Sequence, residues 1–203
     1  MVAIVDYGVG NLFSLKSSFS YIGQDVVVTN NVDTIKSADR VILPGVGAFG
    51  DAAQKLFDSG LAQVLIDLAG EGKPILGICL GMQLMFEKSY EYGEHKGLGL
   101  IKGVIKPIAD EVSKDYKIPH IGWNALKFTE RKSPLFKYIN EGDCVYFVHS
   151  FYGADCDEAL IATAEYGIDV AAAVNSGNVY GTQFHPEKSG EVGMKILRAF
   201  CEL

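Results

Sequence analysis

The sequence predicts an α/β fold of three layers, with an open, mixed but mostly parallel sheet between helices on both faces. In the first half of the chain, short β-branched and apolar runs alternate with segments of helical periodicity. Strands that are apolar on both faces and separated by helices are typical of a parallel sheet covered on both sides. In the second half such runs follow one another closely, with Gly or Asn turns between them. This spacing indicates an antiparallel, β-rich extension in the C-terminal half.

Each element is assigned from its own pattern. Apolar runs of strand length predict strands in the first half at residues 2–6, 25–28, 40–44 and 75–78. Helical periodicity predicts helices from the YGVGN loop to about Ile22, over 49–69 and over 80–88. The second half is predicted to add strands at 144–149, 160–166, 169–175 and 178–184, and a last helix over about 190–200. Open sheets of this kind bind ligands beyond the carboxyl ends of their strands, so the loops that follow strands are candidate sites.

Length and composition limit the classes of protein that the chain can belong to. It has 203 residues, and we expect residues 1–203 to form one domain. Hydrophobic residues make up 48% and charged residues 21%, which is close to globular averages and sufficient for a large core. The formal net charge of -7 provides no basic surface for phosphate groups, so we expect no nucleic-acid partner.

The cellular setting is predicted from the opening residues and the cysteines. The opening MVAIVDYGVGN lacks the basic start and long apolar stretch of a signal peptide, and no apolar run reaches membrane-spanning length. We therefore expect a cytoplasmic protein without a membrane partner. The four cysteines lie far apart and without metal-ligand spacing: Cys79, Cys144, Cys156 and Cys201. This distribution fits a reducing compartment, and we expect no disulfide framework, no metal site and no cofactor.

The stretch PILGICLGMQLMF, residues 74–86, contains the first candidate catalytic residue. Cys79 lies between a predicted strand and a predicted helix, with Gly77 and Gly81 two residues away on either side. A sharp strand-to-helix turn brings these neighbours into close approach, and only very small residues fit there. The pattern is a GxCxG form of the nucleophile elbow, and a helix N-terminus favours a thiolate. The alternative is that Cys79 is one more small buried residue.

A thiolate nucleophile needs a base, and the chain has four histidines. His95 lies in a polar loop and is predicted to face solvent, whereas His120 and His149 lie in apolar runs and are predicted to belong to the core. His185 ends a predicted strand, and Glu187 follows it beyond a proline. Residues i and i+2 of an extended chain point the same way, so Glu187 can orient one imidazole nitrogen while the other faces the sulfur. The alternative is a solvated turn with a chance His and Glu.

Several motifs also carry a family resemblance. GICLGMQLM together with QFHPEKS resembles the Cys/His/Glu pairing of the class I (triad) glutamine amidotransferases, and LPGVGAF (43–49) resembles the loop beside their nucleophile. With DYGVGNL (6–12), PHIGWN (119–124) and YFVHSFY (146–152), the chain most closely resembles the glutaminase subunits of imidazole glycerol phosphate synthases. The motifs occur in the family's order and extend over nearly the whole chain. The resemblance implies the flavodoxin-like, class I glutamine amidotransferase-like version of the predicted fold.

The resemblance implies hydrolysis of L-glutamine to glutamate and ammonia by a Cys-His-Glu triad. Cys79 would form a γ-glutamyl thioester, His185 would pass a proton to the leaving ammonia, and Glu187 would orient His185. The oxyanion hole that such chemistry needs is assigned to main-chain groups of Val46, Gly47 and Leu80. The glycines on both sides of Val46 would allow its peptide to rotate, so that the hole is completed only when this peptide turns. The alternative for this loop is a plain turn after a strand.

The same resemblance assigns residues to the binding of glutamine: Gly45, Gln83, Glu91, His149, Ser150 and Phe151. Gln83 lies one helical turn beyond Cys79, within reach of the α-amino or α-carboxylate end of glutamine. The HSF segment (149–151) corresponds to the family's main-chain contact to that end. Glu91 is assigned to the ammonium group, and a solvated side chain is the alternative.

The family's glutaminase passes its ammonia to a (β/α)8-barrel cyclase subunit in histidine biosynthesis. The resemblance therefore implies a heterodimer with that cyclase. Asn11, Trp123 and Lys188 match positions that face it, and an exposed Trp beside a Lys suits an interface. Trp123 is the only tryptophan, and ordinary core packing is its alternative.

Two other functions remain open at this point. One is the glutaminase subunit of another synthase, such as pyridoxal phosphate synthase, against which the YGVGN and PHIGWN motifs argue. The other is a non-catalytic regulatory module on the same fold, against which the joint presence of Cys79, His185 and Glu187 argues. A stand-alone cysteine hydrolase would need neither the substrate motifs nor the interface motifs.

Overall fold

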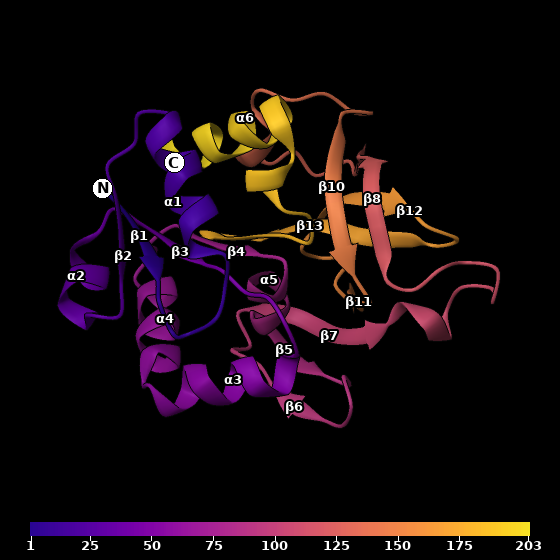
Figure 1. Cartoon of the computed structure of the whole chain (residues 1–203), viewed down its shortest axis with the longest axis horizontal. Coiled ribbons are helices and arrows are strands. Elements are labelled where there is room, and N and C mark those ends of the chain that lie inside the picture. Colours follow the sequence, from indigo (N-terminus) through magenta and orange to yellow (C-terminus); the bar gives the residue numbers. More distant parts are fainter.

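An eight-stranded mixed sheet forms the centre of the molecule in the computed structural model, which describes residues 1–203 (Figure 1). In spatial order its strands are β2 (Val26–Thr29), β1 (Val2–Val5), β3 (Arg40–Leu43), β4 (Ile75–Ile78), β14 (Val179–Thr182), β13 (Asp169–Ser176), β12 (Leu160–Glu165) and β9 (Lys127–Phe128). The strands from β2 to β14 pair in parallel, and those from β14 to β9 pair antiparallel. The strand β14 therefore joins the two kinds of sheet.

Helices cover both faces of this sheet (Figure 1). One face carries α1 (Leu12–Tyr21) and α6 (Gly190–Cys201), and the other carries α2 (Val32–Ser37), α3 (Phe49–Asp58), α4 (Leu61–Gly70) and α5 (Leu80–Leu84). Alternate side chains of β1 pack against the two helical layers. Ile4 packs in the core cluster that contains α1 and α6, and Val5 packs in the cluster that contains α2 to α5. The three-layer α/β prediction is confirmed.

Two smaller sheets lie beside the carboxyl ends of the central strands. One has the order β11 (Phe151–Ala154), β7 (Ile101–Pro107), β5 (Phe86–Ser89) and β6 (His95–Lys96). The other is an antiparallel pair of β8 (His120–Ala125) and β10 (Cys144–His149). Short 3-10 turns complete the fold as η1 (Ile108–Asp110), η2 (Pro134–Phe136) and η3 (Pro186–Lys188). None of the helices combines the length and apolar character that crossing a bilayer requires.

Four predicted elements differ from the structure. The helix predicted over 49–69 is two helices, because Gly60 takes a positive φ of 75° between them. The helix predicted over 80–88 ends at Leu84, and the chain continues into β5. There the backbone N–H of Leu98 donates a hydrogen bond to the Leu84 carbonyl at 2.8 Å. The strand at 144–149 lies outside the main sheet, and the strand at 178–184 is antiparallel to β13 but parallel to β4.

Candidate active site

Cys79 lies on a strained turn between β4 and α5. Its φ of 55° and ψ of -114° are rare for a residue with a side chain. A Cβ atom on Gly81 would lie 1.9 Å from the Leu43 carbonyl oxygen, and one on Gly77 would lie 2.7 Å from the Gly81 oxygen. Both glycines are therefore required by close backbone approach, as the sequence predicts. The helix that follows is shorter than predicted, with five residues.

His185 and Glu187 reach the elbow through the register of β14 beside β4. Thr182 is paired with Ile78, and the Thr182 carbonyl accepts a hydrogen bond from the Cys79 N–H at 2.7 Å. The imidazole Nδ1 of His185 lies 2.7 Å from Oε1 of Glu187, and both side chains are almost fully buried. Burial lowers the pKa of His185, but hydrogen bonding and charge from Cys79 and Glu187 outweigh it and raise the pKa to about 9. The imidazolium form therefore dominates at neutral pH.

A cavity of about 430 Å³ opens over these groups. It brings together Cys79 and His185 with most of the residues that the sequence assigned to the site: Val46, Gly47, Leu80, Gln83, Glu91, His149, Ser150, Phe151 and Lys188. Gly45 does not line the cavity but packs against the elbow, where a Cβ on it would lie 2.6 Å from the Gly81 nitrogen and 2.8 Å from the Leu80 Cβ. The arrangement places a cysteine sulfur, an imidazole and two main-chain loops around one space.

The loop from Gly45 to Gly47 is held at both of its ends. Before it, the Tyr7 hydroxyl donates a hydrogen bond to the Pro44 carbonyl at 2.7 Å, and burial raises the pKa of this phenol. After it, the Phe49 N–H at the start of α3 donates to Oε2 of Glu91 at 2.7 Å. Gly47 takes a positive φ of 94° between these anchors, a conformation that favours glycine.

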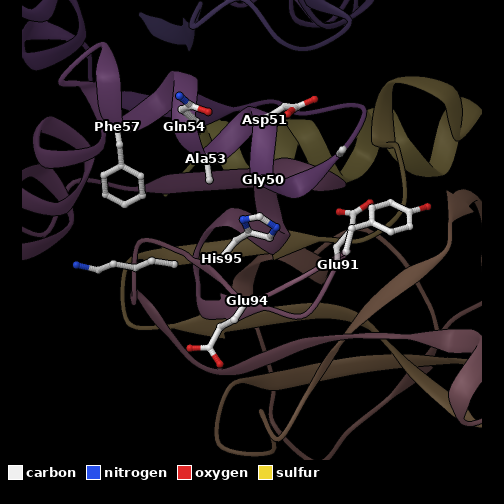
Figure 2. Close-up of a pocket in the computed structure, with 11 residues that line it drawn as sticks. Gly50, Asp51, Ala53, Gln54, Phe57, Glu91, Glu94 and His95 are labelled. Carbon is white, nitrogen blue, oxygen red and sulfur yellow. The ribbon is translucent and has the colours of Figure 1, made fainter.

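Glu91 is buried, so the alternative of a solvated side chain is wrong. Burial raises the pKa of its carboxyl, while the Phe49 N–H lowers it. Glu91 also borders a second cavity of about 690 Å³ between α3 and β6 (Figure 2). There His95 points toward α3 and is half-buried, because the Gly50 position leaves room for its ring. His95 is therefore only partly exposed to solvent, less than the sequence predicts.

Sequence reasoning missed Gln183, which lies directly beside the thiol. Its Nε2 is 3.7 Å from the Cys79 sulfur, and its Oε1 is 2.9 Å from Nε2 of Gln83. The same nitrogen of Gln83 donates to the Phe151 carbonyl at 3.0 Å. Gln183 is the first residue of the QFHPEKS motif, but the sequence analysis gives it no role. Its role depends on how β14 aligns with β4.

His120 and His149 belong to the buried interior, as the sequence predicts, and they contact each other. His120 Nδ1 lies 3.0 Å from His149 Nε2, and His149 Nδ1 lies 2.8 Å from the Phe151 carbonyl. Burial lowers the pKa of His120 to about 4 and that of His149 to about 3. Both rings are neutral at physiological pH.

The three residues assigned to the partner interface lie in different settings. Trp123 on β8 is 58% exposed, so core packing is wrong for it, and the neighbouring Ile121 is equally exposed. Lys188 borders the Cys79 cavity. Asn11 caps α1, with its side-chain oxygen accepting from the Ser14 N–H at 3.4 Å.

Known proteins share this architecture. A family model described as glutamine amidotransferase class-I matches residues 3–202. A crystal structure of a glutamine amidotransferase superposes with a TM-score of 0.77 over 100% of this chain and 98% of that one, at 18% identity. The structure of PurLQS from Thermotoga maritima gives a TM-score of 0.74 over 99% of this chain and 97% of that chain, at 21% identity. The chain belongs to the class-I glutamine amidotransferases.

Relatives with higher sequence identity identify the subgroup of this family to which the chain belongs. The chain is 50% identical over 203 residues to imidazole glycerol phosphate synthase subunit HisH of Bacillus licheniformis, covering 98% of this chain and 95% of that protein. It is 46% identical over 205 residues to the protein of the same name from Wolinella succinogenes, covering 100% of both. Within its class, the chain belongs to the HisH subunits of imidazole glycerol phosphate synthase.

Proposed function

We propose that the chain hydrolyses L-glutamine to glutamate and ammonia through a γ-glutamyl thioester on Cys79. The observation that carries the proposal is the convergence of three groups: Cys79 on a strained turn, His185 in the same cavity, and Glu187 bonded to His185 at 2.7 Å. Membership of a class-I amidotransferase family supports it. A non-catalytic module would have no use for a buried imidazolium beside a thiol.

The first half of the reaction uses His185 as an acid. Its raised pKa keeps the imidazolium beside the Cys79 sulfur at neutral pH. The sulfur attacks the carbonyl carbon of the glutamine amide, and the carbonyl oxygen becomes an oxyanion. His185 gives its proton to the amide nitrogen, the C–N bond breaks, and ammonia leaves with the thioester behind it.

The second half uses the same imidazole as a base. Water attacks the thioester carbon, and the now neutral His185 takes its proton. The second tetrahedral intermediate expels the Cys79 sulfur, which restores the thiolate and its imidazolium partner, and glutamate leaves. Glu187 stabilises the charged imidazole and fixes its tautomer in both halves.

Main-chain N–H groups of Leu80 and of the Val46 and Gly47 loop are proposed to hold both oxyanions. Loss of one such donor typically costs about 10²–10³ in rate. Gln83, Glu91 and the 149–151 segment are proposed to bind the amino-acid end of glutamine, since all of them border the cavity.

The ammonia is proposed to pass to a (β/α)8-barrel cyclase subunit of imidazole glycerol phosphate synthase, in a heterodimer that serves histidine biosynthesis. The names of the relatives support a subunit role. Exposed Trp123 and cavity-lining Lys188, with Asn11, are proposed to face the cyclase. The four free thiols fit the cytoplasm as the proposed location.

The test is Cys79→Ala in the assembled enzyme. Glutamine-dependent synthesis should be lost, while synthesis from added ammonium salts should persist because the cyclase chemistry lies on the other subunit. Cys144→Ala, at an exposed cysteine outside the cavity, is the matched control and should keep both activities. Persistent glutamine hydrolysis in Cys79→Ala, or loss of both activities, would contradict the proposal.

A second comparison tests the partner's effect on the Gly45 to Gly47 loop. Glutamine turnover should be low in the isolated chain and rise sharply when the cyclase and its nucleotide ligand are added. Equal turnover in both states would show that the loop needs no partner to complete the oxyanion hole.

A further inference from the structure

The Phe151 carbonyl fixes the orientation of two buried side-chain amides. A carbonyl oxygen can only accept hydrogen bonds, so the atom of Gln83 that lies 3.0 Å from it is the amide nitrogen. That nitrogen is also 2.9 Å from the side chain of Gln183, which must therefore present its oxygen there. The amide nitrogen of Gln183 is left facing the Cys79 sulfur.

The contact between Gln183 and the sulfur discriminates between the two protonation states of Cys79. A thiolate has no proton and can only accept, and the Gln183 amide lies 3.7 Å away as a donor. A thiol can instead point its proton toward the Val148 carbonyl, 4.0 Å from the sulfur. Gln183 is fully buried, so no water competes for its amide. The fixed amide favours the thiolate.

The same carbonyl also orders the two buried histidines. Nδ1 of His149 lies 2.8 Å from the Phe151 carbonyl and must carry a proton. The neutral ring of His149 then accepts at Nε2, so Nδ1 of His120 donates to it across 3.0 Å. His120 in turn accepts at Nε2, 3.4 Å from the Asn124 amide on β8. The chain of bonds leads from β8 to the carbonyl that holds Gln83.

We propose that Gln183 is a further catalytic residue, a fixed hydrogen-bond donor that stabilises the Cys79 thiolate. His120 and His149 are positioning residues, which hold the Phe151 carbonyl and through it the amide of Gln183. The exposed Trp123 lies on the same strand as His120, so the chain of bonds begins at the proposed partner surface. The inference rests on the proposed function, since it gives Gln183 a role only if Cys79 is the nucleophile.

The test is Gln183→Met, which keeps the length of the side chain and removes its donor to Cys79, together with the oxygen that accepts from Gln83. The readout is the rate at which iodoacetamide alkylates Cys79 in the complete chain, followed across pH by mass spectrometry. A hydrogen bond to a charged group is worth about tenfold or more, so the Cys79 profile should move to higher pH and its rate at pH 7 should fall by about that factor. Alkylation of the exposed Cys144 should not change.

Two more variants keep the test decisive. Thr182→Val is the matched control, because this buried neighbour's hydroxyl has no partner, and its Cys79 profile should match wild type. Gln183→Asn keeps an amide but withdraws it by one methylene group, and should reproduce the shift if Gln183→Met does not fold. An unchanged Cys79 profile in a folded Gln183 variant would overturn the proposal. Alkylation requires no glutamine, so a negative result here can be told apart from a negative result of the Cys79→Ala test of the proposed function.

Kinetics in the assembled enzyme separate a donor to the thiolate from a packing residue. Gln183→Met should lower kcat for glutamine by a larger factor than it raises KM, because the lost donor faces the nucleophile, while the lost acceptor only orients Gln83. His120→Phe should shift the Cys79 profile in the same direction by about threefold, and the double variant should equal Gln183→Met alone. Additive effects would remove the two histidines from the proposal, and a change in KM alone would remove Gln183 as the donor.

Discussion

Two groups of buried histidines in this molecule behave in opposite ways. His185, 3% exposed, has a pKa that is raised to about 9, while His120, also 3% exposed, has one lowered to about 4. His149, 6% exposed, has a pKa of about 3. Burial acts in the same direction at all three rings and lowers each pKa. The groups in contact with each ring therefore decide whether its pKa is raised or lowered.

The partners differ in charge and in what they can accept. His185 faces the Glu187 carboxylate at 2.7 Å and the Cys79 sulfur, and hydrogen bonding and negative charge at these two groups stabilise a charged ring. His120 and His149 face each other at 3.0 Å, and a second charge would repel the first. A histidine in an apolar run is therefore suited to orienting other groups, whereas one beside a carboxylate can carry a proton. The predictions below test this distinction.

The largest expected effect comes from removing the carboxylate. Glu187→Gln keeps the shape of the side chain and should lower kcat for glutamine by about 10⁴, as loss of the equivalent carboxylate does in other triads. The pKa of His185 should fall toward the lowered pKa values of His120 and His149. Steady-state hydrolysis in the assembled enzyme, measured across pH, checks both. A loss of less than tenfold would mean that the carboxylate does not set the state of His185.

The next effect is a loss of stability in acid. His120 and His149 bind protons more readily unfolded, at about 6.5, than folded, at about 4 and 3. The free energy of unfolding should therefore fall as pH falls below 6.5, by up to about 1.4 kcal/mol per pH unit for each group that titrates. Urea unfolding from pH 7 to pH 4.5 measures it. His120→Phe should be less stable than wild type at pH 7, and that deficit should shrink toward pH 4.5.

A smaller effect of opposite sign is expected in alkali. His185 holds its proton more tightly folded, at about 9, than unfolded, at about 6.5. Its contribution is complete below pH 6.5 and is lost as pH rises to about 9, with a slope of at most about 1.4 kcal/mol per pH unit. The same urea series extended to pH 9.5 should be flatter for His185→Gln than for wild type. Equal slopes for the two proteins would mean that His185 is not the group that loses its proton over this pH range.

The smallest effect on the isolated chain is expected at the outer face of β8. Trp123 is 58% exposed beside the inward-facing His120, so Trp123→Ala should change the free energy of unfolding by no more than about 0.5 kcal/mol. Binding of the cyclase should weaken instead, which isothermal titration would detect. A large loss of stability with unchanged binding would reverse the assignment of the two faces.

Local features of the site could be predicted from the sequence. Gly77 marks the elbow because its close contacts, Gly81 and Met82, lie within five residues, and His185 and Glu187 contact each other two residues apart. Gly81 belongs to the same local pattern, but the atom that requires it to be small is the distant Leu43 carbonyl oxygen. Gln183 lies in the QFHPEKS motif, but its contact with Cys79 could not be predicted, because that contact depends on the pairing of strands about 100 residues apart.

The fold shows the same division between local and long-range causes. The strands with β-branched runs were predicted, whereas β5 was assigned to a helix. The start of β5 is set by backbone N–H groups within residues 98–101, which donate hydrogen bonds to the Leu84 and Met85 carbonyls. No local sequence pattern predicts these bonds. Trp123 likewise looks like a core residue until the pairing of β8 with β10 turns it outward.

The position of β14 also controls when the enzyme can become reactive during its own synthesis. The strand β14, which ends three residues before His185, pairs with β4, although about 100 residues separate the two strands. A ribosome releases the chain from its N-terminus, so Cys79 emerges long before its base, and domains generally fold as their last long-range contacts become available. A nascent or truncated chain that lacks residues 179–187 therefore lacks His185 and Glu187, and under the proposed mechanism such an incomplete molecule should not hydrolyse glutamine.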